Sequence, residues 1–222
     1  MAVVTFLDAS FAKETKGRSQ QGMFQVATTT NALEGKTTAN QIETNSSKIS
    51  RVVKSTMAAE SCSLGTAVDR QLYVRLLFQV CMYGEENMDK DWRLGLRVPG
   101  YLVTDARSLY DHLTTTGSLP AERQTMLDLL SAKELIEAGV IHIRWVPTQH
   151  QLADHLTKQM SCELLKKFKE DQQVALVQSK EEAKVEKHKS ELRRAQRQRR
   201  KVRMKQVNEN SSPNIKQIGY VF

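Results

Sequence analysis

The chain has 222 residues, with 33 Lys and Arg against 25 Asp and Glu, and its formal net charge is +8. Residues 1–160 contain 17 basic and 17 acidic side chains, so the whole positive excess lies in residues 161–222. No stretch approaches the roughly 18 apolar residues of a membrane span, and the start, MAVVTFLDAS, lacks the basic region of a signal peptide. Three scattered cysteines fit neither a disulfide framework nor a zinc site. We therefore expect a cytoplasmic or nuclear protein with no membrane span, whose basic end favours a polyanionic partner.

The first half of the chain predicts three strands followed by a long helix. Short runs rich in β-branched and aromatic residues are typical of strands. The expected strands are 3–7, 22–30 and, more weakly, 41–44. Apolar residues recur at every fourth position from Leu64 to Val80, which predicts a helix over 55–83. Ser55 is the expected N-cap of this helix and Gly84 its C-terminal stop.

The second half alternates between strands and helices. The expected strands are 101–104 and 140–146, and the expected helices are 107–113, 120–137 and 148–160. Thr148 and Gln151 have the capping-box spacing, which places the start of the last helix. This order of elements predicts an α/β fold with a mixed sheet covered by helices. The composition then becomes charged, so we expect a domain at 1–160 and a basic C-terminal extension at 161–222, partly helical or disordered.

Four acids occupy positions where a carboxylate is costly to bury. Asp8 and Asp105 each end an apolar strand, whereas Glu60 and Asp154 lie on apolar helix faces near predicted helix starts. If the first and fourth strands are parallel neighbours, their acids meet at one sheet edge. Carboxylates gathered there would repel one another unless divalent cations bind, and oxygen ligands favour Mg²⁺ or Mn²⁺. The pattern leaves a second interpretation open, in which these acids serve only turns and helix starts.

Four segments resemble the RNase H domain of copia-type retrotransposon polyproteins, which lies at the C-terminal end of the reverse transcriptase. They are TFLDASFA with QGMF after it, KSTMAAESCSL, YLVTDARSLYDHL and WVPTQHQLADHLTK. Their order and spacing agree with that family over roughly residues 3–160. The resemblance implies an RNase H-like mixed five-stranded sheet flanked by helices. It also implies an enzyme that hydrolyses the RNA strand of RNA–DNA hybrids by two-metal catalysis, with Mg²⁺ or Mn²⁺.

Specific residues follow from the resemblance. The catalytic and metal-binding acids would be Asp8, Glu60, Asp105 and Asp154. The resemblance also offers a histidine near the last acid, His150, which would assist proton transfer or product release, but the sequence favours an exposed loop histidine without a role. Residues beside the acids would contact the hybrid backbone, or alternatively cap helices. These residues are Ser55, Thr56, Arg107 and Ser108.

The basic extension has no counterpart in the resemblance. Arg199, Arg200 and Lys201 lie in its most basic stretch, which suits contact with nucleic-acid phosphates or a nuclear localisation signal. A solvated extension without a binding role is the alternative. The polymerase, integrase and protease regions of the family are absent, and the sequence reads as a fragment of an element or a gene model built on one. A reverse transcriptase domain is a further expected partner.

The sequence also departs from the family. The third strand lacks the usual tryptophan, and Ala106 follows the third acid where the family usually has asparagine. These departures keep a second hypothesis open, a catalytically decayed remnant that binds nucleic acid without cleaving it. An unrelated α/β domain is a third possibility, which the WVPTQHQLADHLTK segment disfavours.

Overall fold

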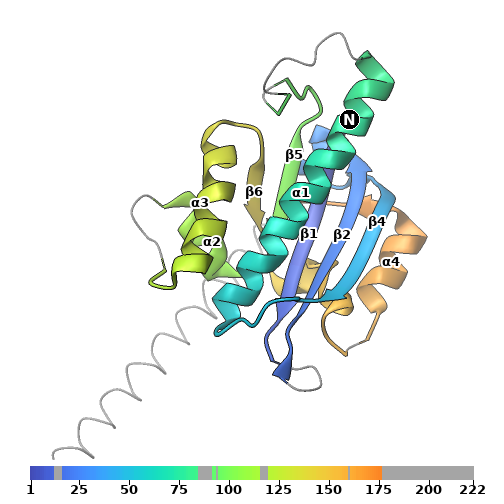
Figure 1. Cartoon of the computed structure of the whole chain (residues 1–222). Coiled ribbons are helices and arrows are strands. Elements are labelled where there is room, and N and C mark those ends of the chain that lie inside the picture. Colours follow the sequence, from blue (N-terminus) through green and yellow to red (C-terminus); the bar gives the residue numbers. More distant parts are fainter. Residues whose placement is uncertain (13–16, 85–91, 94, 116–119, 160, 177–222) are drawn as a thin grey trace, which may run out of the picture. The chain divides into compact units, whose positions relative to one another are not determined.

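A computed structural model describes residues 1–12, 17–84, 92–93, 95–115, 120–159 and 161–176, and Arg199, Arg200 and Lys201 lie outside these residues. Its centre is a five-stranded sheet in the order β4-β2-β1-β5-β6 (Figure 1). The strands are β1 (Ala2–Ser10), β2 (Gln20–Thr28), β4 (Asn40–Lys48), β5 (Gly100–Thr104) and β6 (His142–Trp145). β2 pairs antiparallel with both β1 and β4, whereas β1, β5 and β6 run parallel. The predicted mixed five-stranded sheet flanked by helices is confirmed.

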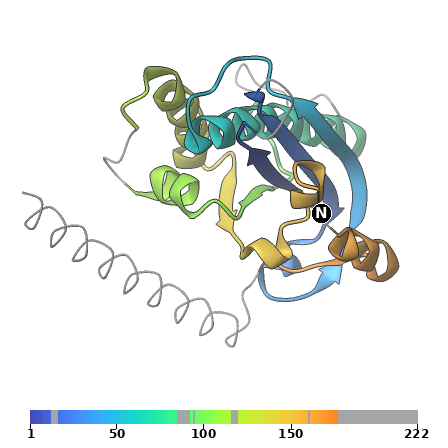
Figure 2. The same ribbon diagram turned by 90° about the horizontal axis from the view of Figure 1, so that it is seen from below.

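Three helices cover one face of the sheet (Figures 1 and 2). They are α1 (Thr56–Tyr83), α2 (Arg107–Thr114) and α3 (Arg123–Glu137). Leu64 and Leu72 of α1 are buried in one cluster with Leu7 of β1, Leu102 of β5 and Ile143 of β6. The four-residue spacing of the α1 leucines places them on one side of the helix, and the alternation of the strand residues brings their partners to the same face. The amphipathic patterns read from the sequence thus build this layer.

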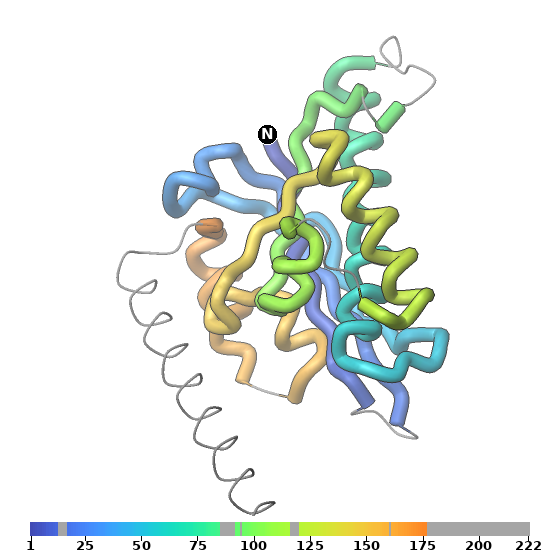
Figure 3. Tube along the Cα trace, turned by 90° about the vertical axis from the view of Figure 1, so that its left-hand side faces the viewer, coloured from blue at the N-terminus to red at the C-terminus, as the bar shows by residue number. Residues whose placement is uncertain are grey.

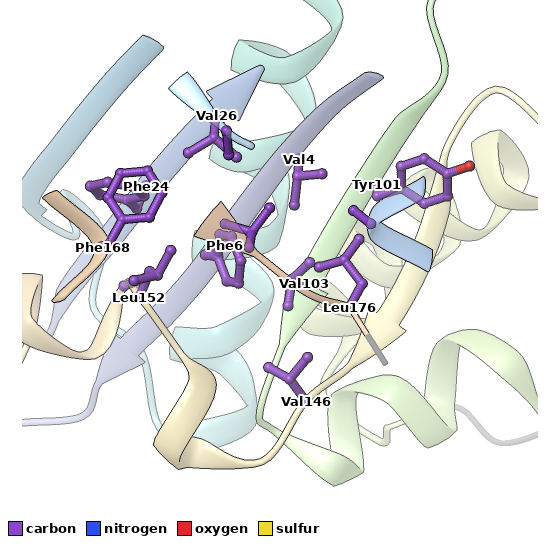
Figure 4. Close-up of a cluster of buried hydrophobic side chains, with 14 of the residues drawn as sticks. Val4, Phe6, Phe24, Val26, Tyr101, Val103, Val146, Leu152, Phe168 and Leu176 are labelled. Atoms are coloured by element: carbon purple, nitrogen blue, oxygen red, sulfur yellow. The ribbon is translucent and has the colours of Figure 1, made fainter. Parts of the chain in front are cut away.

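The opposite face is covered by chain that follows β6 (Figure 4). Phe6 of β1 and Phe24 of β2 pack there against Phe168 of α4 (Glu163–Asp171), and the rings of Phe24 and Phe168 meet edge to face, 5.3 Å between centroids. A short strand, β7 (Gln173–Val174), pairs with β3 (Thr37–Thr38) beyond α4. The predicted extension, 161–222, therefore begins with a stretch that packs on the sheet. None of the helices in the described residues is both long and apolar enough to cross a membrane.

The predicted boundaries of α1 are confirmed, but the predicted helix over 148–160 is wrong. The Ser55 hydroxyl accepts a hydrogen bond from the Ala58 amide at 3.1 Å, and Gly84 ends the helix with φ +73°. In place of a last helix there are two 3₁₀ turns, η3 (Thr148–His150) and η4 (Asp154–Leu156). Gln151 prevents a continuous helix because its backbone is extended and its buried amide donates to the Leu7 carbonyl at 2.9 Å.

A buried polar band lies between α1 and the sheet, formed by Thr5, Gln25, Gln71, Arg75 and Gln79. The Gln25 and Gln71 amides both donate to the Thr5 hydroxyl, at 2.9 and 3.0 Å. The Arg75 guanidinium donates to the carbonyls of Val98 and Val140, at 2.7 and 2.6 Å. Burial lowers the pKa of Arg75 to about 10. Backbone carbonyls therefore satisfy a buried cation in this band.

Candidate metal centre

Two aspartates meet at the carboxyl edge of the parallel strands. Phe6 and Val103 are register partners in β1 and β5, and Asp8 and Asp105 each follow two residues later. Asp154 joins them from η4, on the segment after β6 that returns beside β1 and β2 (orange beside blue in Figure 3). Carboxylate oxygens of Asp8, Asp105 and Asp154 lie within 4.8 Å of one another. The parallel pairing and the return of the chain thus gather three acids that are far apart in sequence.

Glu60 approaches the same place from the first turns of α1. It lines an open cleft of about 430 Å³ together with Asp8 and Asp105. The residue is only 6% exposed, and its Oε2 is buried without a hydrogen-bond partner. Burial, and then the charges of Asp8 and Asp105, raise the pKa of Glu60 to about 9. We call Asp8, Glu60, Asp105 and Asp154 the acidic cluster.

The acidic cluster fits a divalent cation by its chemistry. Hard carboxylate oxygens are the ligands that Mg²⁺ and Mn²⁺ prefer. The unpartnered oxygen of Glu60 is a buried acceptor without a donor, a costly arrangement that a cation would relieve. The same cation would compensate the negative charges of the neighbouring carboxylates, which raise the pKa of Glu60.

The Asp8 carboxylate has two partners that the sequence interpretation did not single out. One oxygen accepts a hydrogen bond from the Thr157 hydroxyl, and the other lies 3.2 Å from the Lys158 ammonium nitrogen. Lys158 also lies 2.7 Å from Asp154 Oδ1. Burial raises the pKa of Asp8, while the Thr157 hydrogen bond and the Lys158 charge oppose this shift. The i, i+4 spacing of Asp154 and Lys158 is a signal that could have revealed the ion pair.

Asp105 is fixed by residues around the end of β6. Its Oδ2 accepts a hydrogen bond from the Thr148 hydroxyl at 2.8 Å, and its backbone carbonyl accepts one from the Trp145 indole at 2.9 Å. Ala106, which departs from the family, is the N-cap residue of α2 and provides no side-chain hydrogen bond there. Asp105 is therefore oriented by β6 and η3, not by the helix that follows it.

Only some of the residues expected to contact nucleic acid line the cleft beside the acidic cluster. Thr56 and Ser108 line the cleft beside the acidic cluster, whereas Ser55 caps α1. Arg107 is exposed at the start of α2, where its guanidinium pairs with Asp111 at 3.0 Å and lies 5.4 Å from the centre of the Trp145 ring. His150 is half-buried at the end of η3. Of the expected nucleic-acid contacts, Thr56 and Ser108 thus line the cleft.

No protein family model matches the chain, and no curated protein matches it. Solved structures that resemble it include RNase H1 from the halophilic archaeon Halobacterium salinarum NRC-1, at 16% identity and a TM-score of 0.44, covering 75% of this chain and 99% of that chain. LC11-RNase H1 in complex with an RNA/DNA hybrid is 12% identical, with a TM-score of 0.44 and coverage of 70% and 93%. The foamy viral protease–reverse transcriptase in complex with dsDNA is 15% identical, with a TM-score of 0.38 and coverage of 71% and 92%. These likenesses are weak, and the fold assignment rests on the strand order and directions described above.

Proposed function

We propose that this chain is a metal-dependent ribonuclease that hydrolyses the RNA strand of RNA–DNA hybrids, derived from a copia-type retrotransposon. The observation that carries the proposal is the gathering of Asp8, Asp105 and Asp154 within 4.8 Å, beside buried Glu60, at the edge of the parallel strands. The four sequence segments that resemble the copia-type domain supply the acids of this cluster.

The acidic cluster would hold Mg²⁺ or Mn²⁺, which supply an activated water and stabilise the charge that develops on the leaving oxygen. Asp8 and Asp105 would be the central ligands, because they lie at the ends of two neighbouring strands of the rigid sheet. Thr148 would keep the Asp105 carboxylate in one orientation, and Thr157 would do the same for Asp8. Such fixed ligands would meet the metal with little reorganisation.

The cleft would take the hybrid along its minor groove, where 2′-hydroxyl groups distinguish RNA from DNA. Thr56 and Ser108 are placed to hydrogen-bond sugar or phosphate oxygens beside the acidic cluster. Arg107, exposed at the start of α2 next to Ser108, would contact a phosphate. We also propose that Arg199, Arg200 and Lys201 add sequence-independent phosphate contacts, which salt would weaken.

The test is cleavage of a labelled RNA strand in an RNA–DNA hybrid, with Mg²⁺, with Mn²⁺ and with chelator. We expect metal-dependent products that carry 5′-phosphate ends, and no cleavage of single-stranded RNA or duplex DNA. Asp105→Asn should reduce the rate by at least about a thousandfold, because it removes a charged ligand from the centre of the cluster. Asp69→Asn, an exposed acid on α1, is the matched control and should retain full activity.

The second candidate is a remnant that binds hybrid without cleaving it, favoured by the loss of a polar side chain at Ala106. A folded protein that binds hybrid but cleaves none under either metal would select this candidate. Cleavage that resists chelator, or an Asp105→Asn variant as active as its parent, would refute the metal-dependent mechanism.

A further inference from the structure

The acidic cluster already contains a cation that belongs to the chain. The Lys158 ammonium nitrogen lies 2.7 Å from Asp154 Oδ1 and 3.2 Å from Asp8 Oδ1, and thus spans the two carboxylates. Both aspartates are almost fully buried, whereas the Lys158 side chain keeps 29% of its surface exposed. Among the described residues, these two acids are the carboxylates within ion-pair distance of Lys158.

A divalent ion held by both Asp8 and Asp154 would be bound by the same two carboxylates that Lys158 now contacts, so it would compete with the ammonium group for them. The ammonium group has no lone pair, so it can only repel such an ion. Two divalent ions carry four positive charges, which four ionised carboxylates balance, and a fifth positive charge at this place is unfavourable.

The Lys158 side chain can also leave the acidic cluster. Its side chain lines the open cleft, so the ammonium group can move into solvent by rotation of side-chain bonds. The backbone need not follow, because the Lys158 amide remains bonded to the Asp154 carbonyl at 3.0 Å and the Thr157 amide to the same carbonyl at 3.2 Å.

We propose that Lys158 is a built-in cation that occupies a metal position between Asp8 and Asp154, and that it must leave before a divalent ion bridges these carboxylates. This inference rests on the metal centre of the proposed function. In the metal-free protein, Lys158 stabilises the cluster by compensating its charge. Its presence raises the Mg²⁺ or Mn²⁺ concentration needed to fill the centre.

The test is titration calorimetry of the full chain with Mn²⁺, for the parent, Lys158→Met and Lys166→Met. Methionine retains the length of the side chain without its charge, and Lys166 is an exposed lysine of α4 that serves as the control. We expect Lys158→Met to bind Mn²⁺ at least about tenfold more tightly than the parent and Lys166→Met. In chelator its melting temperature should fall below that of the parent, and Mn²⁺ should raise it by a larger amount.

A second measurement uses the parent protein and does not depend on the variant folding. The ¹⁵N-labelled ammonium group of Lys158, held by two carboxylates, should give an exchange-protected resonance in chelator, which Lys158→Arg identifies by its loss. Addition of Mg²⁺ should abolish that protection. Equal Mn²⁺ affinity in the parent and Lys158→Met, or a resonance that persists at saturating Mg²⁺, would overturn the role of Lys158 and leave the metal centre intact. Absence of Mn²⁺ binding in every protein would overturn the metal centre itself, and this inference with it.

Discussion

The polar band and the acidic cluster both include buried polar residues of α1, but they differ in charge. The polar band contains one buried cation, Arg75, and neutral hydroxyl and amide groups. Its guanidinium is satisfied by two backbone carbonyls, and Gln71 ties α1 to the Tyr101 carbonyl of β5 at 2.9 Å. Such a network holds helix and sheet in a fixed arrangement. We interpret it as structural.

The acidic cluster collects groups of one sign of charge beside an open cleft. Lys158 compensates part of this charge. An oxygen of Glu60 has no hydrogen-bond partner, but buried amide atoms of Gln25, Gln71 and Gln79 in the polar band have none either, so the two regions differ in charge. Carboxylates that raise one another's pKa destabilise the folded protein. Their presence in one place therefore indicates a bound ligand or a functional site. Burial of polar groups alone therefore does not mark a functional site, whereas an uncompensated set of like charges beside a cleft does.

The largest expected effect on stability concerns the polar band. Replacement of Arg75 by methionine leaves the carbonyls of Val98 and Val140 without donors, and each buried acceptor costs about 1–3 kcal/mol. We therefore expect Arg75→Met to lower the free energy of unfolding by about 2–6 kcal/mol in urea denaturation. Arg70→Met removes a half-exposed arginine of the same helix and should cost no more than about 1 kcal/mol. If the two variants were equally stable, the structural role of the polar band would be wrong.

A smaller effect is expected where the last segment meets β2. A Cβ atom on Gly22 would lie 2.8 Å from both Leu156 Cβ and Thr157 Cγ2. Gly22→Ala should therefore displace the segment that carries Asp154, with a loss of about 1–3 kcal/mol in stability and weaker Mn²⁺ binding. Gly65→Ala is the control, because its Cβ would meet nothing within 4 Å and alanine favours a helix. Unchanged Mn²⁺ binding in Gly22→Ala would show that this contact does not position the cluster.

A further expected effect concerns how the free energy of unfolding depends on pH in the metal-free protein. The pKa of Glu60 is raised from its ordinary 4.5 to about 9 in the folded state. Between these values the unfolded chain releases the proton while the folded chain keeps it, so the free energy of unfolding falls as pH rises. The free energy of unfolding can fall by at most about 1.4 kcal/mol per pH unit, and water in the open cleft makes the decrease smaller. The Glu60→Gln variant lacks this pH-dependent contribution. Asp8 is present in both the parent and the variant, so its own titration does not enter their difference.

Denaturation of the parent and of Glu60→Gln at pH 5 to 9 in chelator measures this contribution. We expect the variant to gain stability relative to the parent with each increase in pH, and Glu134→Gln, an exposed acid of α3, to show no such trend. A constant difference between Glu60→Gln and the parent across this range would mean that Glu60 ionises normally, and that the cluster is better solvated than its burial indicates.

The parts of the site that the sequence could predict are those with local patterns. Asp8 and Asp105 follow apolar strand runs, and Glu60 lies on the apolar side of a regularly spaced helix, so their positions follow from periodicity. The convergence of Asp8 and Asp105 then needs only the parallel pairing of β1 and β5, which the structure contains.

The segment after β6 could not be predicted in the same way. Its capping-box pattern was misleading, because Gln151 donates to the Leu7 carbonyl in β1, 144 positions away. The contacts of Thr157 with Asp8 and of Thr148 with Asp105 also join residues far apart in the chain, 149 and 43 positions, and nothing in the local sequence distinguishes them. Tertiary hydrogen bonds decided the structure here, against local preference.

We expect the acidic cluster to bind divalent metal ions and the polar band to bind none. The most direct test is anomalous scattering from crystals of the full chain soaked in Mn²⁺. We predict a manganese peak within coordination distance of carboxylate oxygens of Asp8 and Asp105, with Asp154 alongside, and no peak at the polar band. Saturating Mn²⁺ with no peak at the acidic cluster, in crystals where the cleft is open to solvent, would contradict the account.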